Sequence, residues 1–370
     1  MNKVKLTLLT RDNDYAAYFS NYMINPDNSE KFSAKIYTDI EVFRKNTRNQ
    51  KQHVLITDFK LKPDDVITFE KVVQLSEIPL AEDDKEKAIF KFQPLTQFLS
   101  QILSIYYETN EKLSTVFDKN KKENVISFYS GSGAAGKTIL SLCLAKYLAQ
   151  QGKKVFYLNF EQLHTTNLYF KEEKESSTEV FYYLKNNNER LLSKIESLKS
   201  KDAFTNIDYF SLPAEPEEMQ TLTSEQVNGL ITSLRDTQNY DFILIDLESS
   251  LHKRNSAAME TSDEVFWILN SDEASFSRSQ NILDNNLLGS NIDRSKIHFM
   301  LNKVGQNMFE GADNYNFSIE DRIAFKQNWL EMSEGTKLLE DNELGKMLAK
   351  HLKSGIEAEA EVASFGYESR

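Results

Sequence analysis

Short apolar runs alternate with amphipathic stretches along the chain, and the scale of this alternation changes after about residue 112. In the first part, "VKLTLL", "FSAKIY", "HVLITDF", "VVQLS" and "AIFKF" have the pattern of buried strands. Between and after them, "YAAYFSNYMI", "IEVFRKN" and "LTQFLSQILSIYY" have the spacing of amphipathic helices. The pattern predicts a small alternating α/β domain over residues 1–112.

A polar, charge-rich segment, "ETNEKLSTVFDKNKKEN", separates this part from a larger patterned region, and predicts a linker over residues 113–122. The larger region contains "NVISFYSG", "KKVFYLNF", "DYFSLP", "DFILID", "VFWILN" and "KIHFMLNKV". Strands this uniformly apolar are typical of a mainly parallel sheet that helices cover on both faces. We therefore predict a second α/β domain over residues 123–355, followed by an acidic tail over 356–370.

The segment "GSGAAGKT", residues 131–138, fits the strand–GxxxxGK[ST]–helix pattern of a phosphate-binding loop. Small residues let backbone N–H groups converge on a phosphate, and the helix that follows directs its partially positive end at the same group. Lys137 would add a positive charge, and Thr138 a hydroxyl for Mg²⁺. The sequence thus predicts a P-loop NTPase domain whose cofactors are ATP and Mg²⁺. The candidate binding residues in and after the loop are Ser132, Gly133, Ala134, Ala135, Gly136, Lys137, Thr138 and Ile139.

Two acidic residues follow apolar strands and complete the candidate site. Asp246 ends "FILID", and the carboxyl ends of parallel strands are where ligands gather. Glu161 follows "YLNF" and could position a water or join the magnesium shell. We expect Thr138, Asp246 and Glu161 to hold the metal, and Lys137, Glu161 and Asp246 to serve any catalysis. Acids that merely end a strand or sit in a solvated loop are the alternatives.

The arrangement "SGSGAAGKT … NFE … FILID … LNKV" resembles the deviant P-loop ATPases of the MinD/ParA superfamily, over residues 124–352. The resemblance implies an ATP-dependent homodimer. It also implies nucleotide contacts by Asn302 and Lys303, with the amide of Asn302 on the adenine edge. A turn or capping role for Asn302 is the alternative.

The first lysine of that family's loop, which crosses the dimer interface to the partner's nucleotide, is replaced here by Ser132. A serine cannot supply positive charge to a transferring phosphoryl group. We therefore expect ATP binding with weak or absent intrinsic hydrolysis. Lys253 and Arg254 are candidates to replace the missing charge, and a solvated charged loop is the alternative for both.

The first domain resembles a degenerate, flavodoxin-like response-regulator receiver. Asp12, Asp58, Ser76 and Lys91 match, in order, a metal-binding acid, a phosphoacceptor, a switch hydroxyl and a lysine of that family. The family's usual acid pair is here Arg11 followed by Asp12, and the spacings between the later residues leave little room for full third and fourth helices. We expect an atypical receiver retained for docking or dimerisation.

A receiver-like domain followed by a deviant ATPase resembles the TadZ/CpaE group of pilus-assembly proteins. This resemblance implies a cytoplasmic protein, often at the cell pole, whose partners are pilus or secretion assembly proteins. The alternatives are a DNA-partitioning ParA-like ATPase, a receiver-regulated signalling ATPase, and a small-molecule kinase or ligase.

Charge and composition narrow these alternatives. The 370 residues contain 44 Lys and Arg against 56 Asp and Glu, a net charge of -12 that disfavours non-specific nucleic-acid binding. Cys143 is the only cysteine, which excludes an internal disulfide, and we expect it in the core. We expect no transmembrane segment, so membrane association would go through partners. The five histidines have no metal-ligand spacing, and His298 is expected in the core.

Overall fold

The structure is a computed structural model of the 370-residue chain. The predicted linker and the predicted acidic tail lie outside the residues that it describes. The chain divides into two compact units, Met1–Asn120 with Glu189–Leu198, and Lys121–Asn188 with Lys199–Arg370. The described residues are 3–25, 28–29, 32–48, 50–78, 88–109, 123–170, 178–186, 191–213, 215–289, 291–305, 309, 311–327, 329 and 335–352.

The first unit is built on a parallel sheet whose five described strands follow the order β2-β1-β3-β4-β5. This is the strand order of the flavodoxin-like fold, so the predicted fold class of this unit is confirmed. Each strand has buried apolar residues on one or both of its faces. The strands are β1 (Val4–Leu9), β2 (Phe32–Tyr37), β3 (Gln52–Thr57), β4 (Phe69–Ser76) and β5 (Ala88–Phe90).

Helices cover both faces of this sheet. On one face, α1 (Asn13–Met23) and α5 (Leu95–Thr109) share a core in which the rings of Phe19 and Phe98 meet edge to face, 5.7 Å between centroids. On the other face, α3 (Ile40–Thr47) packs Phe43 against Phe69 of β4. Between β3 and β4 the chain forms only the single turn α4 (Pro63–Val66), as the short spacing predicted.

One helix of the first unit comes from far along the sequence. Helix α8 (Leu191–Leu198) packs against α5, although the residues before and after its segment belong to the second unit. The first unit is therefore formed by two segments of the chain, one before the predicted linker and one after it.

The second unit contains a sheet whose eight described strands follow the order β13-β12-β11-β6-β10-β7-β9-β8. The paired strands run parallel except for the edge strand β8, which confirms the predicted mainly parallel sheet. The short β8 and the half-exposed β13 lack an apolar run, and the sequence pattern did not reveal them. The strands are β6 (Asn124–Tyr129), β7 (Val155–Phe160), β8 (Lys199–Lys201), β9 (Asp208–Phe210), β10 (Phe242–Leu247), β11 (Glu264–Asn270), β12 (Ile297–Val304) and β13 (Ile319–Ala324).

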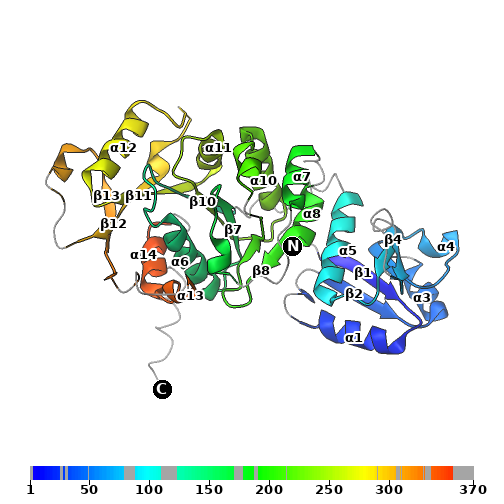
Figure 1. The fold of residues 1–370 in the computed structure, drawn as a ribbon. Helices are drawn as coiled ribbons and strands as arrows, with labels where there is room; N and C mark the ends of the chain where they lie inside the picture. The colour runs from blue at the N-terminus through cyan, green and yellow to red at the C-terminus, as the bar shows by residue number, and fades with distance from the viewer. Residues whose placement is uncertain are drawn as a thin grey trace, which may run out of the picture. The chain divides into compact units, whose positions relative to one another are not determined.

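Two layers of helices cover this sheet, so its central strands are buried on both sides (Figure 1). Helices α6 (Lys137–Gln150) and α14 (Asn342–Ala349) lie on one face, where α14 packs along α6. Helices α10 (Ser224–Asp236), α11 (Lys253–Thr261) and α12 (Glu273–Asp284) lie on the other. The remaining helices among the described residues of this unit are α7 (Glu179–Asn186), α9 (Pro216–Gln220), α13 (Gly335–Leu338) and the short 3₁₀ turns Thr166–Leu168, Arg294–Lys296 and Ala312–Asn314.

Cys143 is buried in the core of this unit, as predicted. Within the described ranges, no helix has the length and apolar character needed to cross a bilayer.

The close approach of α14 to α6 depends on Gly345. A Cβ atom at this position would lie 2.5 Å from Cβ of Tyr147 and still closer to the carbonyl oxygen of Cys143. We expect Gly345→Ala to lower the free energy of unfolding by about 1–3 kcal/mol, because overpacking forces the helices apart. Denaturant unfolding measures the change. Gly305→Ala is the control, since a Cβ there meets nothing within 4 Å. Equal stability of Gly345→Ala and the wild type would contradict this helix contact.

Candidate functional site

The phosphate loop connects β6 to α6, and its last glycine is required by the backbone. Gly136 has φ +92°, in the left-handed region that favours glycine. A Cβ atom there would also lie 2.5 Å from Nδ2 of Asn302. Ala134, with φ +54°, also takes a left-handed conformation in the loop. The loop therefore turns sharply, so that α6 begins at Lys137.

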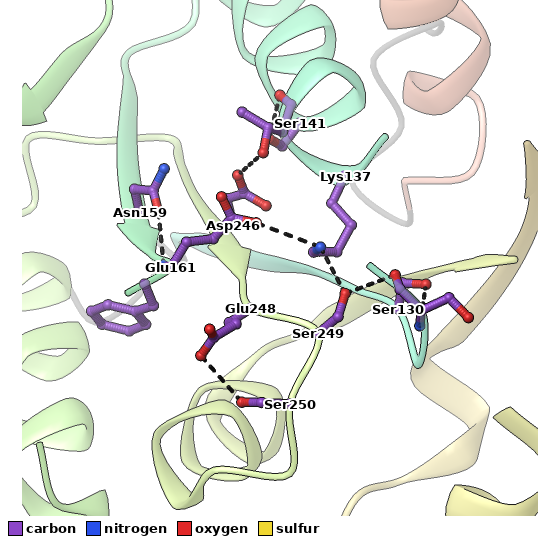
Figure 2. A network of polar contacts seen from close by, with 12 residues as sticks. Ser130, Lys137, Ser141, Asn159, Glu161, Asp246, Glu248, Ser249 and Ser250 are labelled. Carbon is purple, nitrogen blue, oxygen red and sulfur yellow. Dashed lines mark hydrogen bonds and ion pairs between the residues drawn. The ribbon is translucent and has the colours of Figure 1, made fainter. Parts of the chain in front are cut away.

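The side chain of Lys137 is buried and held by polar partners from the segments that follow two other strands, β7 and β10. Its Nζ donates to Oγ of Ser249 at 2.9 Å and lies 3.5 Å from Oε1 of Glu161 (Figure 2). Ser249 in turn donates to the carbonyl oxygen of Ser132 in the loop, at 2.8 Å. The ammonium group of Lys137 is thus held at the loop by groups that a bound phosphate could replace.

Asp246 lies at the carboxyl end of β10, fully buried beside the loop helix. Its Oδ2 accepts hydrogen bonds from the hydroxyls of Thr138, at 2.6 Å, and Tyr157, at 3.0 Å. Its Oδ1 is buried without a hydrogen-bond partner. Burial, reinforced by the nearby carboxylate of Glu161, raises the pKa of Asp246 to about 7.

These oxygens fit a magnesium ion. Mg²⁺ prefers oxygen ligands and keeps several of its own waters, and the free Oδ1 of Asp246 could accept from such a water. The hydroxyl of Thr138, now bonded to Asp246, is a second oxygen at the same place. A divalent cation would also favour the ionised form of Asp246.

Glu161 directly follows β7, and its carboxylate approaches the ammonium group of Lys137. Burial raises the pKa of its carboxyl, and the charge of Lys137 partly opposes this effect. The backbone N–H of Glu161 donates to Oδ1 of Asn159 at 2.8 Å, which fixes the turn after the strand (Figure 2). The fold therefore brings Lys137, Glu161 and Asp246 together from three separate segments.

Asn302 and Lys303, near the end of β12, contact the backbone of the loop. Nδ2 of Asn302 donates to the carbonyl oxygen of Ala135 at 2.8 Å, and Nζ of Lys303 to that of Ala134 at 2.5 Å. Oδ1 of Asn302 accepts from the backbone N–H of Lys303. Both side chains thus help to shape the loop, and the adenine contact of Asn302 stays a prediction. Ile139, the third residue of α6, packs against the core.

Ser132, which stands where the related family has a lysine, is 5% exposed. Its backbone N–H donates to Oγ of Ser130 at 3.2 Å. Nη1 of Arg278, on α12, lies 3.5 Å from its Oγ. A guanidinium group therefore approaches the loop at the position where the lysine is missing.

The two cations that the sequence suggested as replacements do not approach this position. Arg254 is buried, pairs with Glu248, and donates to the carbonyl oxygens of Phe160 and Met219, so it joins segments of the domain. Lys253 is exposed at the first position of α11. Neither lies in a solvated loop, because both belong to a helix that the sequence pattern did not reveal.

Sequence reasoning missed three residues of the site. Ser249 lies three positions after Asp246, so its nearness to the loop could have been inferred from the strand end. Tyr157 lies inside an apolar strand, where its hydroxyl gave no signal. Arg278 meets the loop only through tertiary packing, from 146 residues away.

The first unit has a cavity of about 430 Å³ at the carboxyl edge of its sheet. Nζ of Lys91 lies 2.9 Å from Oδ2 of Asp12 and 2.9 Å from Oε1 of Glu77. Asp58 accepts from the hydroxyl of Thr10 at 2.7 Å. The hydroxyl of Ser76 donates locally, to the carbonyl oxygen of Ile78. The lining residues are Arg11, Asp12, Asp58, Leu75, Glu77 and Lys91.

Comparisons with known proteins agree with the fold of the second unit. A family model described as an AAA domain matches residues 123–306. The structure of a ParA family ATPase from Chlorobium tepidum is 19% identical, covers 62% of this chain and 100% of its own, and has a TM-score of 0.52. No curated protein matches the sequence. The second unit is thus a P-loop NTPase domain with the fold of ParA-type ATPases.

Two further structures match with lower TM-scores. A putative plasmid partition protein from Borrelia burgdorferi, bound to AMPPNP, is 16% identical and covers 63% of this chain and 100% of its own, with a TM-score of 0.46. The septum site-determining protein MinD from Pyrococcus horikoshii, complexed with Mg-ADP, is 20% identical and covers 64% and 100%, with a TM-score of 0.43.

The buried carboxyl of Asp246 makes stability depend on pH. Its pKa in the folded protein, about 7, lies above the usual value of 3.8, so the folded state holds this proton more tightly than the unfolded state does. Without nucleotide or Mg²⁺, this group therefore stabilises the fold at low pH and loses that effect as pH rises through 7. The variant Asp246→Asn has no carboxyl group to titrate at this position. As the pH rises from about 5 to about 8, we expect its free energy of unfolding to increase by about 2 kcal/mol relative to that of the wild type.

Denaturant unfolding of both proteins at the two pH values measures this gain. If the difference between them is the same at both values, Asp246 does not carry a raised pKa.

Proposed function

We propose that this protein binds ATP with Mg²⁺ and acts as a nucleotide-dependent homodimer that positions or assembles a Tad-type pilus or secretion machinery. The observation that carries the nucleotide part is the meeting of Lys137, Thr138 and Asp246 at the phosphate loop. The ParA-like fold of the second unit supports it. The assembly role rests on the order of the two units, a flavodoxin-like domain before a ParA-like ATPase domain.

The residues of the loop suit a triphosphate. The first turn of α6 presents backbone N–H groups and the positive end of its dipole, and Lys137 can exchange Ser249 and Glu161 for phosphate oxygens. Thr138 and Asp246 would hold Mg²⁺, which neutralises charge on the phosphates. Glu161 lies close enough to Lys137 to orient a water near the end of such a ligand.

Weak or absent hydrolysis follows from Ser132. A serine hydroxyl cannot neutralise the charge that develops on the transferring phosphoryl group, and a cation supplied there accelerates related reactions about 10³–10⁵-fold. Binding without rapid turnover suits a switch that stays in one state until a partner acts. We infer that ATP holds the dimer together, and that the protein works at the pilus site, often the cell pole, in the cytoplasm.

A receiver-regulated signalling ATPase is the second candidate. Asp12, Asp58 and Lys91 line one cavity in the first unit, as a phosphoacceptor site requires. Arg11 in place of a second acid, and the ion pairs of Lys91 with Asp12 and Glu77, favour docking over phosphoryl transfer.

Removal of the lysine charge tests the nucleotide-dependent dimer. We expect the purified wild type to retain ATP and to elute as a dimer with Mg-ATP, and Lys137→Ala to lose both properties. Nucleotide extraction and light scattering measure them. In cells of the source organism, Lys137→Ala should then fail to restore surface pili to a strain that lacks the gene.

The matched control is Lys346→Ala, which removes an exposed lysine from α14 and should behave as the wild type. A monomer indifferent to nucleotide would contradict the proposal. Salt-sensitive binding of duplex DNA by the ATP form, with normal pili in the deletion strain, would favour the partitioning alternative instead.

A lysine at position 132 tests the account of weak hydrolysis. We expect Ser132→Lys to raise kcat for Mg-ATP at least about tenfold, because it restores a cation to the loop. Phosphate release, measured at saturating ATP, gives kcat. Ser132→Ala is the control, since it changes the residue without adding charge. Fast hydrolysis by the wild type would contradict the account, as would an unchanged kcat in a variant that still binds ATP and dimerises.

A further inference from the structure

Histidines and carboxylates gather at the edge of the second sheet opposite the phosphate loop. Glu264 begins β11, His298 is the second residue of β12, and Glu320 is the second residue of β13. Because these strands are parallel, their first residues lie at one edge, whereas the loop follows the end of β6. His351 reaches this edge from the chain just after α14.

Three potential ligand atoms face one another in this cluster. Nδ1 of His298 and Nδ1 of His351 each lie 2.9 Å from Oε2 of Glu320. One nitrogen or oxygen from each residue lies within 4.8 Å of the others. In a tetrahedral zinc site with bonds of about 2.0–2.1 Å, the ligand atoms are about 3.3 Å apart. Small side-chain rotations would therefore suffice to surround an ion.

The outer nitrogens of both histidines have carboxylate partners. Nε2 of His298 lies 3.0 Å from Oε2 of Glu264, and Nε2 of His351 lies 2.6 Å from Oδ2 of Asp321. Each of these carboxylates can accept a proton held on Nε2, and in that tautomer the lone pair of Nδ1 is available to an ion beside Glu320. Carboxylate–histidine pairs of this kind orient metal-ligating imidazoles in proteins.

The cluster has room for a positive charge at its centre. When each imidazole carries its proton on Nε2, two nitrogen lone pairs and a carboxylate oxygen of Glu320 face one another, beside two further carboxylates. Three carboxylates placed around two imidazoles attract a dication. The side chain of Glu264 is 2% exposed and that of Glu320 is 32% exposed. One carboxylate of the cluster is thus buried in the protein, and another can be reached from solvent.

We propose that His298, Glu320 and His351 bind one Zn²⁺ ion, with Glu264 and Asp321 orienting the two imidazoles. Two imidazoles and one carboxylate form a known zinc ligand set, and imidazole favours zinc over magnesium. The ion would tie the chain after α14 to the first residues of β12 and β13. Helix α14 packs on α6, the helix that begins with Lys137. The bound ion would therefore stabilise the position of α14 against the helix that follows the phosphate loop. This inference does not depend on the proposed function.

Equilibrium dialysis of the full chain tests the site. The protein is first stripped of metal with a chelator, then dialysed against Zn²⁺ at neutral pH with excess Mg²⁺, which occupies sites made of oxygen ligands alone. We expect one Zn²⁺ per chain by elemental analysis, and a higher Tm with zinc. His351→Gln and Glu320→Gln should each lose this binding. Asp321→Asn should weaken it about 10–100-fold, because it acts only through His351.

His252→Gln is the control, because it removes a histidine that lies outside the cluster, and it should bind zinc as the wild type does. Circular dichroism confirms that each variant is folded. Glu320→Gln changes a partly exposed strand residue, so it keeps the test decisive if His351→Gln unfolds. Folded wild type that takes up no zinc at micromolar concentration would show an ion-pair cluster only. Full binding by both Glu320→Gln and a folded His351→Gln would place the metal elsewhere. Either result overturns the proposal.

Discussion

The candidate nucleotide site depends on the burial of one carboxyl group. Asp246 lies inside the second unit with one oxygen bonded to the hydroxyls of Thr138 and Tyr157 and the other without a partner. A buried acid in this state lowers the stability of the protein at neutral pH unless a cation or a proton accompanies it. Magnesium bound with a triphosphate would relieve this cost, and a buried acid with a raised pKa is typical of a candidate functional site.

In the proposed function, the binding and the cleavage of ATP depend on different residues. Lys137, Thr138 and Asp246 would supply the charge and the ligands that favour bound nucleotide. Acceleration of phosphoryl transfer needs a further cation aimed at the reacting phosphate, and Ser132 does not provide one. Arg278, beside Ser132, supplies positive charge near the loop, and its distance of 3.5 Å from the hydroxyl suits a contact with the loop itself. The proposed switch would therefore depend on partners for its timing.

Much of this architecture could be predicted from the sequence, and the exceptions have physical causes. Apolar runs such as residues 242–245 identify central strands, and the GxxxxGK[ST] spacing identifies the loop, because both are local patterns. β13 and α11 were missed because their residues are largely polar and are held by tertiary contacts. Arg278 and the cluster around His298 and His351 depend on segments far apart in the sequence, where spacing carries no information.

The central claim is that residues 131–138 bind a triphosphate with magnesium. A crystal structure of the full chain with Mg²⁺ and a non-hydrolysable ATP analogue tests it most directly. The account predicts phosphate oxygens at Nζ of Lys137 in place of Ser249 and Glu161, and a magnesium ion beside Thr138 whose water reaches the free oxygen of Asp246. A loop that stays empty at saturating nucleotide, with Lys137 still bonded to Ser249, would contradict it.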